Sequence, residues 1–287
     1  MSRPSFAEYR AIMEAHGFRP SRRFGQNFLL DPSLHRAIAD AAELERSDLV
    51  LEVGAGLGFL TRELVTRAGR VVAVEIDDRL LAILRDDVVR WEDAQRVEFV
   101  HADALEGDGL SGELVAAVTA AAVDLGPIKL VANLPYAVSG RFLAAALAST
   151  ELTLRLAVIV VQRELADRLA AAPGSRDYGG LSVLSQACGP VELVRPIGRE
   201  VFRPRPNVDS ALVRIDVRRP LPSGFAEFVR AMFASRRKTL RHAFGRSGVR
   251  LPAAVAEEFG RRRAEQCTAE EFLDLFALAS QHGENPG

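Results

Sequence analysis

A glycine-rich turn and an acidic side chain give the first chemical signal in the chain. The segment Glu52-Val53-Gly54-Ala55-Gly56-Leu57-Gly58 ends an apolar, β-branched run, and glycines in such a turn let backbone approach a ligand closely. Glu75 lies at the tip of the next apolar run, 21 residues after Gly54. A carboxylate there can accept hydrogen bonds from both hydroxyls of a ribose. Gly54, Gly56 and Glu75 therefore predict a site for an adenosine-type nucleotide.

The spacing of the glycines narrows the choice of nucleotide. A dinucleotide fingerprint, Gly-x-Gly-x-x-Gly, requires glycine where the chain has Phe59, and no Gly-x-x-x-x-Gly-Lys-Ser/Thr loop occurs. The form Gly-x-Gly-x-Gly, preceded by the acid Glu52, is found in S-adenosylmethionine-dependent methyltransferases, which have no pyrophosphate to bind. Glycines after a strand also occur in ordinary tight turns, so the specificity of the pattern depends on Glu75.

A further acidic side chain, Asp103, follows the apolar run at 97–101. As a cofactor ligand, Asp103 could accept a hydrogen bond from the amino group of adenine. Aspartate is also favoured as the N-cap of a helix, and taken alone this second interpretation is slightly preferred.

The tetrapeptide Asn133-Leu134-Pro135-Tyr136 carries the second chemical signal. An exocyclic amine on adenine is a poor nucleophile, because its lone pair is delocalised into the ring, and it needs hydrogen-bond acceptors that pyramidalise the nitrogen. The Asn133 oxygen and a backbone carbonyl near Leu134 and Pro135 can do this, and Pro135 has no N–H to compete. Tyr136 offers a face on which a flipped base can stack. The plainer alternative is a strand-end turn with a partly buried tyrosine.

Strands and helices must position these residues. Apolar runs predict strands at 49–53, 71–76, 97–101, 128–132 and 157–161, and amphipathic stretches predict helices at 57–67, 78–90, 106–125 and 139–150. This alternation predicts a parallel sheet covered on both faces. Two further strands, 191–197 and 208–217, are separated by a segment too proline-rich for a helix, so they predict an antiparallel pair at one edge.

A linker rich in proline and glycine at 218–224 precedes an entirely helical pattern, with helices expected at 225–235, 238–244, 253–262 and 269–280. The predicted fold class is therefore α/β. It is a Rossmann-like, seven-stranded class I methyltransferase sheet, mostly parallel with an antiparallel edge pair, followed by a small all-helical domain. The predicted domains are 1–218, whose first 45 residues form a helical and basic extension, and 219–287.

Composition excludes several classes of protein. The 287 residues are 48% hydrophobic and 26% charged, which excludes a wholly disordered, collagen-like or disulfide-stapled chain. Cys188 and Cys267 are far apart and have no histidine pair nearby, so we expect no metal site and a reducing compartment. No apolar run reaches the ~18 residues that span a bilayer. We expect a cytoplasmic protein without a signal peptide and, in the absence of a long apolar surface stripe, a monomer.

The net charge of -1 hides a strongly basic segment. Residues 195–250 contain 14 Arg or Lys against four acidic residues. Such an asymmetry indicates an anionic partner bound on one face.

Six motifs occur in the order typical of one family, and on them the chain resembles the rRNA adenine N6,N6-dimethyltransferases, above all the bacterial group that modifies small-subunit (16S) rRNA. The motifs are Phe24-Gly25-Gln26-Asn27-Phe28-Leu29-Leu30-Asp31, the glycine turn at 51–58, Val74-Glu75-Ile76-Asp77, Asn133–Tyr136 with Ser139, the Phe-x-Pro-x-Pro stretch at 202–211, and Arg236-Arg237-Lys238-Thr239-Leu240-Arg241.

The resemblance implies functions for particular residues. It implies that Phe202 packs against the target adenine opposite Tyr136. Two positions depart from the family pattern, because Ala55 replaces the usual proline and Ala137 replaces an asparagine that could bond near the base. The resemblance also implies contacts to S-adenosylmethionine from Asn27, Leu29, Gly54, Glu75, Asp103 and Asn133.

Basic residues are expected to bind the phosphates of rRNA and to position the flipped base. For the cluster at 236–241, a solvated charged face is the alternative. The expected partner is a precursor of the small ribosomal subunit. The residues assigned to this role are Arg22, Arg23, Arg203, Arg205, Arg236, Arg237, Lys238 and Arg241.

The leading hypothesis is therefore dimethylation of adenosines in small-subunit rRNA. The alternatives are a large-subunit (23S) rRNA methyltransferase of the macrolide-resistance type and a non-catalytic RNA-binding factor of ribosome assembly. A dehydrogenase is the weakest alternative, because Phe59 breaks the dinucleotide fingerprint and no hydride-site residues are evident.

Overall fold

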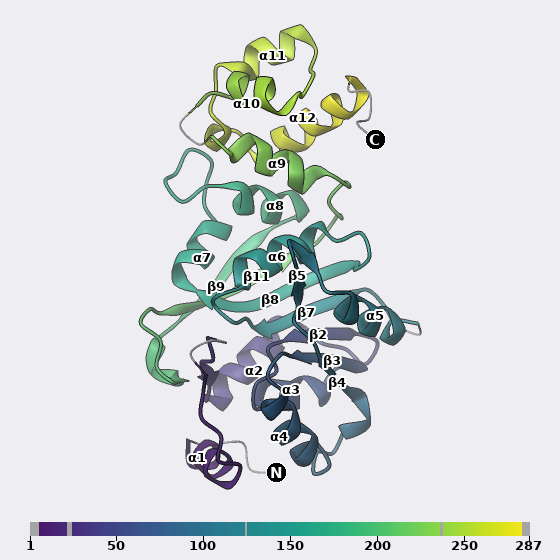
Figure 1. Ribbon diagram of the computed structural model, residues 1–287, viewed down its shortest axis with the longest axis vertical. Coiled ribbons are helices and arrows are strands. Elements are labelled where there is room, and N and C mark those ends of the chain that lie inside the picture. The colour runs from purple at the N-terminus through teal and green to yellow at the C-terminus, as the bar shows by residue number, and fades with distance from the viewer. Residues whose placement is uncertain (1–5, 22–24, 124, 236–237, 283–287) are drawn as a thin grey trace.

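The computed structural model describes residues 6–21, 25–123, 125–235 and 238–282. At its centre is a seven-stranded sheet in the order β4-β3-β2-β7-β8-β11-β9 (Figure 1). The first five strands in this order are parallel, and β11 pairs antiparallel with both β8 and β9. The predicted fold class is confirmed. The strands are β2 (Leu49–Val53), β3 (Arg70–Glu75), β4 (Val97–His101), β7 (Ile128–Asn133), β8 (Leu154–Gln162), β9 (Val191–Ile197) and β11 (Ser210–Asp216).

Strand β8 extends beyond its predicted range of 157–161. It lies between β7 and β11 in the sheet and pairs with both along its length. Leu154 pairs with Ile128 of β7, and Gln162 pairs with Ser210 of β11. The backbone hydrogen bonds to β7 and β11 thus extend the strand beyond both ends of the predicted range.

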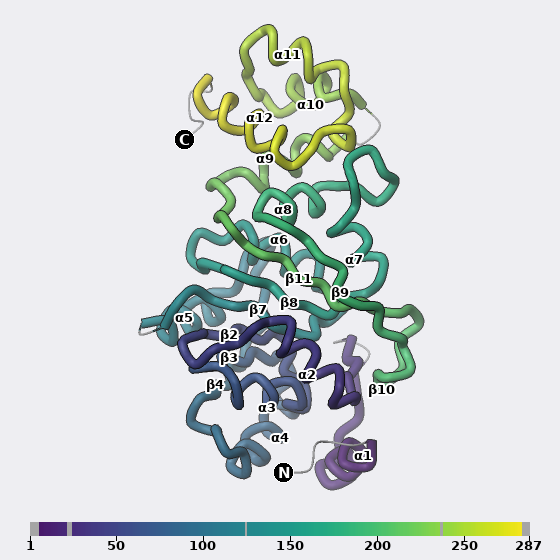
Figure 2. The backbone as a smooth tube through the Cα atoms, turned by 180° about the vertical axis from the view of Figure 1, so that it is seen from behind, coloured from purple at the N-terminus to yellow at the C-terminus, as the bar shows by residue number. Residues whose placement is uncertain are grey.

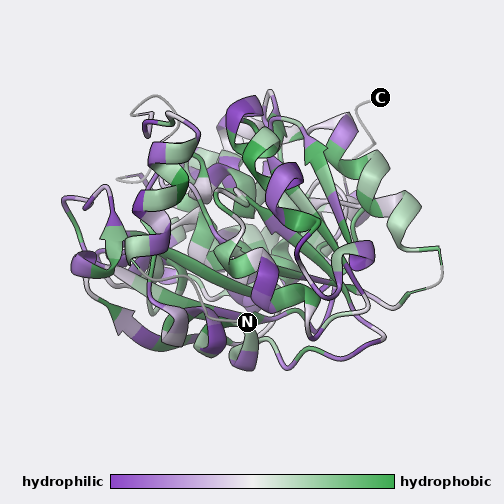
Figure 3. Ribbon diagram, turned by 90° about the horizontal axis from the view of Figure 1, so that it is seen from below, coloured by the Kyte–Doolittle hydropathy of each residue, from purple (hydrophilic) through white to green (hydrophobic). Residues whose placement is uncertain are grey.

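Helices cover both faces of the sheet. Alternate strand residues point to opposite faces, so Leu51 belongs to one apolar cluster and Val50 to the other. Figure 3 shows apolar strands enclosed by helices whose outer faces are hydrophilic. One face carries α2 (Pro32–Ala41), α3 (Phe59–Val65) and α4 (Asp78–Val88), and the other carries α5 (Gly112–Ala121), α6 (Ser139–Ala148), α7 (Arg163–Leu169) and α8 (Gly180–Cys188).

The prediction of a helix at 106–125 is wrong for residues 106–111, which come before the first helical residue. A short hairpin, β5 (Leu105–Glu106) and β6 (Gly109–Leu110), precedes α5. The two residues of the turn are Gly107 and Asp108, and Gly107 has φ +60°, a conformation that favours glycine at the first position of a two-residue hairpin turn. The helix itself begins after Ser111, whose side chain accepts a hydrogen bond from the Leu114 N–H.

The C-terminal helices pack on the α6–α8 side of the sheet (Figure 1). Phe225 and Phe272 are fully buried in the same apolar cluster as that face of the sheet. They are core residues, and residues 217–224 are irregular where a linker is expected. The division into two domains stays a prediction. The helices are α9 (Phe225–Phe233), α10 (Leu240–Ser247), α11 (Ala253–Gly260) and α12 (Ala269–His282).

Residues 25–29 of the N-terminal segment line the cavity at the carboxyl edge of the sheet. After α1 (Phe6–Ala15), the two-residue strand β1 (Phe28–Leu29) pairs antiparallel with β10 (Phe202–Arg203), and Figure 2 shows the two chain segments side by side. The ring of Phe28 lies 6.0 Å from Tyr9 and 6.3 Å from Phe18. The pairing of β1 with β10 was not predicted, because strands of two residues show no alternation of polarity.

Lys129 anchors the amino end of β7, the strand that ends in Asn133. Its Nζ lies 2.8 Å from Asp48 Oδ2 and donates to the carbonyls of Ala42 and Glu43 at 3.1 and 2.7 Å. Both partners of the ion pair are buried.

Within the described residues, no helix is both long and apolar enough to cross a bilayer.

We expect Lys129→Met to lower the free energy of unfolding by about 3–5 kcal/mol, because it leaves the Asp48 carboxylate buried without its cation. Adding Asp48→Asn should recover part of this loss. Urea denaturation measures both values, with Arg163→Met as the control because the Arg163–Asp167 pair is solvent-exposed. Equal effects of the buried and exposed substitutions would contradict the anchoring role.

Candidate active site

Four neighbouring parallel strands end at one cavity of about 330 Å³. The glycine turn follows β2, Glu75 ends β3, Asp103 follows β4, and Asn133 ends β7. Ligands of open α/β sheets bind at such carboxyl edges. The cavity is lined by all the residues predicted to bind the cofactor and by the whole tetrapeptide motif, namely Asn27, Leu29, Gly54, Gly56, Glu75, Asp103, Asn133, Leu134, Pro135 and Tyr136.

Two glycines let other segments close over the turn. Gly54 has φ +80°, and a Cβ atom there would lie 3.1 Å from the Pro135 ring. Gly56 has φ +60°, and its Cβ would lie 3.1 Å from the Phe28 ring. Ala55, where the family usually has proline, donates its N–H to the Val74 carbonyl at 3.3 Å, a bond that proline cannot make.

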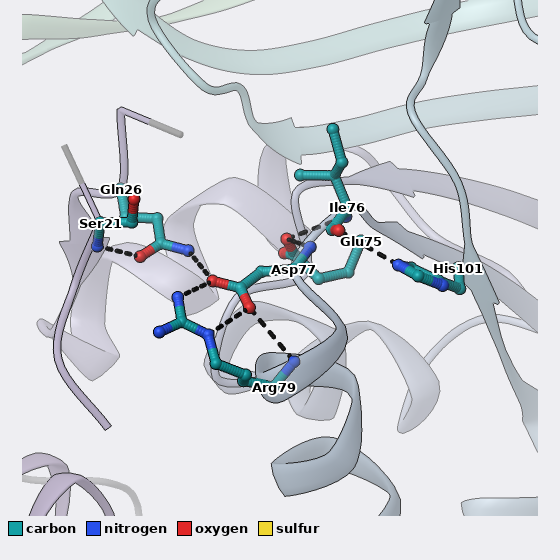
Figure 4. A network of polar contacts seen from close by, with 7 residues as sticks. All are labelled: Ser21, Gln26, Glu75, Ile76, Asp77, Arg79 and His101. Carbon is teal, nitrogen blue, oxygen red and sulfur yellow. Dashed lines mark hydrogen bonds and ion pairs between the residues drawn. The ribbon is translucent and has the colours of Figure 1, made fainter. Parts of the chain in front are cut away.

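The Glu75 carboxylate is held in place by backbone N–H groups (Figure 4). Its Oε2 accepts from Gly56 N at 2.8 Å, and its Oε1 accepts from Ile76 N and Asp77 N, both at 3.0 Å. Burial raises the pKa of Glu75, while these hydrogen bonds oppose the shift. The carboxylate thus lines the cavity with an acceptor position left on Oε2 for a ligand, because two N–H groups already bond to Oε1.

Asp103 is not the N-cap of a helix. Its Oδ1 accepts a hydrogen bond from Leu105 N at 3.0 Å, which forms a local turn before the β5–β6 hairpin. The side chain is exposed and lines the cavity. The N-cap interpretation is therefore wrong, and the cofactor role stays a prediction.

Asn133 presents an unpaired acceptor in the cavity wall. Its Nδ2 donates to the Asn27 carbonyl at 3.2 Å, whereas its Oδ1 is buried and has no hydrogen-bond partner among the described residues. Leaving a buried carbonyl oxygen unpaired costs about 1–3 kcal/mol. Such a cost is expected where a ligand supplies the missing donor.

Tyr136 and Phe202 are in edge contact. Their ring centroids are 6.5 Å apart with an interplanar angle of 68°, and Phe202 is fully buried. This arrangement leaves no parallel slot for a base between the two rings. The Tyr136 hydroxyl lies 2.6 Å from the hydroxyl of Ser210 on β11, and burial raises the pKa of Tyr136.

Glu52 is the most perturbed acid of the site. It lines the cavity, it is 1% exposed, and its Oε2 has no hydrogen-bond partner among the described residues. Burial raises the pKa of Glu52 to about 8, the nearby Thr61 hydroxyl opposes the shift, and the charge of Glu75 adds to it. Burial therefore keeps this carboxyl group protonated to a higher pH than an ordinary glutamate.

Sequence reasoning assigned no role to Ile76, Gln26 or His35, all of which line the cavity. Ile76 keeps 38% of its surface exposed although it is apolar, directly after Glu75. An apolar residue following the acid at a strand end is the signal that could have identified it. The His35 ring lies 3.0 Å from the Leu29 carbonyl.

The basic residues do not form a single cluster. Arg203 lies on β10 and donates to the Glu200 and Phe202 carbonyls, both at 2.7 Å, and Arg205 is exposed nearby. Lys238 precedes α10 and Arg241 lies on it, and Figure 2 shows α10 at the top of the molecule and β10 in its lower half. Four of the predicted RNA-binding residues lie outside the described residues, namely Arg22, Arg23, Arg236 and Arg237.

Comparison with known proteins links most of the chain to one family. Residues 17–281 match the sequence model of a family described as ribosomal RNA adenine dimethylase. Ribosomal RNA small subunit methyltransferase A of Geobacillus sp. (strain WCH70) is 38% identical, with 95% of this chain and 96% of the relative covered. The protein of the same name from Pelotomaculum thermopropionicum is 42% identical, with 85% and 83% covered.

Two solved structures share the fold. A dimethyladenosine transferase from Plasmodium falciparum superposes with a TM-score of 0.68 at 24% identity, covering 88% of this chain and 96% of that one. The 23S rRNA methyltransferase ErmE superposes with a TM-score of 0.63 at 28% identity, covering 88% and 100%.

We expect Glu52→Gln to stabilise the ligand-free protein, and the gain should be larger at high pH. The pKa of Glu52 is about 8 in the folded protein and about 4.5 when unfolded, so ionisation destabilises the fold increasingly as pH rises between these values. The gain in unfolding free energy should be roughly 2–4 kcal/mol greater at about pH 8 than at about pH 5.

Urea denaturation at the two pH values measures this difference. Glu14→Gln on the exposed side of α1 is the control, because it replaces a glutamate that is not buried. A gain from Glu52→Gln that is equal at both pH values would contradict the buried ionisation.

Proposed function

The chain belongs to the ribosomal RNA adenine dimethylase family, and we propose that it transfers methyl groups from S-adenosylmethionine to N6 of adenosines in the RNA of the small ribosomal subunit. The targets we propose are two adjacent adenosines near the 3′ end of 16S rRNA, each receiving two methyl groups. The relatives at 38% and 42% identity carry a small-subunit name, which supports this target.

The unpartnered Asn133 Oδ1 is the observation that carries the proposal. It is buried in the wall of the cavity that also contains the glycine turn and Glu75. An adenine N6–H supplies the donor that this oxygen lacks, and the bond draws the nitrogen toward a pyramidal geometry. Catalysis then depends on orientation and on electrostatic complementarity to the reacting amine.

The Leu134 carbonyl is the second acceptor that we propose for the amine. The Pro135 carbonyl already accepts hydrogen bonds from Val138 N and Ser139 N, both at 3.1 Å, at the start of α6. The Leu134 N–H donates to the Val160 carbonyl at 3.1 Å, which holds this backbone in line with β8. Two acceptors on one rigid strand end can bind both N–H groups of the amine.

The cavity fits S-adenosylmethionine through its acceptors and its apolar wall. Glu75 suits the ribose hydroxyls, Asp103 suits the adenine amino group, and Ile76 offers an apolar contact to the purine. The unpaired oxygen of Glu52 suits a cationic group. When bound, S-adenosylmethionine supplies a methyl group that its sulfonium has already activated, so the chain needs no strong general base.

Tyr136 supplies the stacking face for the flipped adenine. Its hydroxyl contact with Ser210 and its edge contact with Phe202 hold the ring at a fixed angle. Phe202 therefore contacts the Tyr136 ring in an edge arrangement and orients it, and this proposed role replaces the expected sandwich of the base between the two rings. A base stacked on one aromatic ring gains about 1–3 kcal/mol.

The RNA partner is a precursor of the small subunit, and the protein acts on it as a cytoplasmic monomer. Arg203 and Arg205 lie beside β1 at the same end of the molecule as the cavity, where they can contact phosphates next to the flipped base. Lys238 and Arg241 can contact a second, distant stretch of the same RNA.

Methylation of large-subunit RNA is the alternative within the family. The likeness to the 23S rRNA methyltransferase ErmE supports it, but at 28% identity this likeness is lower than that to the small-subunit relatives. A non-catalytic assembly factor is less well supported, because Gly54, Glu75 and Asn133 all line one cavity.

We expect Asn133→Ala to slow methyl transfer at saturating S-adenosylmethionine by at least roughly a hundredfold, the effect of removing one positioned hydrogen-bonding group. Asn133→Asp keeps an acceptor but loses the donor to the Asn27 carbonyl. Its rate should therefore be lower than that of the wild-type protein. Single-turnover methylation of unmodified small subunits measures these rates. The control is Gln95→Ala, at an exposed position before the amino end of β4 and outside the residues that line the cavity. Wild-type rates in a folded Asn133→Ala protein would contradict the mechanism.

A second measurement tests the target. We expect isolated small subunits whose RNA lacks N6 methylation to accept labelled methyl groups, and large subunits to accept almost none. Mass spectrometry of the digested RNA identifies dimethyladenosine and its position. Preferential labelling of large subunits would favour the alternative.

A further inference from the structure

The Gln26 side chain joins the N-terminal segment to the first turn of α4. Its Oε1 accepts a hydrogen bond from Ser21 N at 2.7 Å, and its Nε2 donates to Asp77 Oδ2 at 2.9 Å. Figure 4 shows the Gln26 amide between Ser21 and Asp77, and Arg79 bonded to the same Asp77 carboxylate. Gln26 also lines the cavity.

Asp77 connects Gln26 to the carboxylate that we assign to the ribose. Asp77 is 2% exposed and is the N-cap of α4, and its backbone N–H donates to Glu75 Oε1 at 3.0 Å. Burial would raise the pKa of Asp77, but hydrogen bonds from Arg79 and then Gln26 hold that pKa below its ordinary value. Gln26 is therefore one hydrogen bond from Asp77, whose backbone binds Glu75 directly.

The next residue, Asn27, reaches the other half of the site. Its carbonyl accepts the hydrogen bond from Asn133 Nδ2 at 3.2 Å, and its own Nδ2 donates to the Gly25 carbonyl at 2.9 Å. The bond to the Asn27 carbonyl determines which end of the Asn133 amide faces the cavity. A shift of residues 25–27 would therefore change the direction of the unpaired Asn133 oxygen.

Apolar packing already holds the N-terminal segment on the molecule. Phe18 and Phe28 are buried with Leu80 and Ile83 of α4, and the Arg79 guanidinium lies 4.9 Å from the Phe18 ring centroid. The hydrogen bond from Gln26 to Asp77 is thus not needed to attach the segment. It fixes where residues 25–27 lie along the face of α4.

We propose that Gln26 is a positioning residue that aligns the cofactor carboxylate Glu75 with the catalytic amide of Asn133. The proposal rests on the proposed function, because it gives both groups their roles. Gln26 acts on one group through Asp77 and on the other through the Asn27 carbonyl. Its loss should weaken S-adenosylmethionine binding and also slow methyl transfer at saturating S-adenosylmethionine.

Gln26→Glu tests this with almost no change of shape. The substituted side chain keeps an oxygen to accept from Ser21 N, but it replaces the donor to Asp77 with a second carboxylate. At low pH a proton shared between the two carboxylates restores a donor, whereas Gln26→Ala has no group to protonate. The charged and titratable groups around this position are Asp77, Asp78 and Arg79 of α4, Glu75 of β3, His101 of β4 and Glu52 of β2.

The measurements are the Kd of S-adenosylmethionine by calorimetry and the single-turnover rate, each as a ratio to wild type at the same pH. The ratio cancels the titration of groups that all variants share. We expect both variants to bind roughly tenfold more weakly and to react more slowly at about pH 8, the effect of losing one hydrogen bond to a charged group. Toward about pH 5.5 Gln26→Glu should recover and Gln26→Ala should not.

Gln95→Glu is the charge-matched control, since Gln95 is exposed in the turn Ala94–Arg96 before β4, and its ratios should stay near one. Ratios near one for both Gln26 variants would overturn the proposal, as would a lower melting temperature with unchanged Kd and rate. Recovery of Gln26→Ala at low pH would also overturn it. Failure of the wild-type protein to bind S-adenosylmethionine in the same titration would instead contradict the proposed function.

Discussion

Only one of the two polar atoms of the Asn133 carboxamide has a hydrogen-bond partner among the described residues. Its nitrogen is committed to the Asn27 carbonyl, and its oxygen is buried in the cavity wall with no partner among the described residues. Much of the surrounding structure keeps that oxygen in place. Parallel pairing with β2 and β8 fixes the strand that carries it, and Gly54 lets Pro135 close against the glycine turn. The unpaired acceptor is thus a consequence of rigid surroundings, which is what an orienting mechanism requires.

The same site concentrates electrostatic cost. Glu52 and Glu75 are both buried and both have a raised pKa, and the charge of Glu75 makes Glu52 harder to ionise. Glu75 is compensated by three backbone N–H groups, whereas Glu52 keeps an oxygen without a partner in the described part of the chain. Local rules of burial and pairing are therefore broken where a polar, cationic ligand is to be bound. Functional sites commonly depart from the stability optimum in this way.

Much of this arrangement could be predicted from the sequence, because strands of a parallel sheet read as continuous apolar runs and their ends mark one edge. Gly54, Glu75, Asp103 and Asn133 were identified on that basis and by resemblance, and they line one cavity. The β1–β10 pairing and the hairpin at 105–110 were missed, since such short segments carry no periodicity. The relation of Tyr136 to Phe202 depends on packing between distant segments, and the separation of the basic residues depends on where α10 docks. Neither is encoded by a local pattern.

The apolar cluster that runs from the sheet through α8 into α9 and α12 bears on how this architecture can diversify. Phe225 and Phe272 share one apolar cluster with residues of α6, α7 and α8, so substitutions in the terminal helices and in that face are expected to be coupled. Exchange of the last 69 residues between relatives would bring mismatched side chains into one continuous interior. Recombination within the family should therefore favour crossovers that move α8 with the tail, and the tail would evolve as part of the scaffold rather than as a portable module.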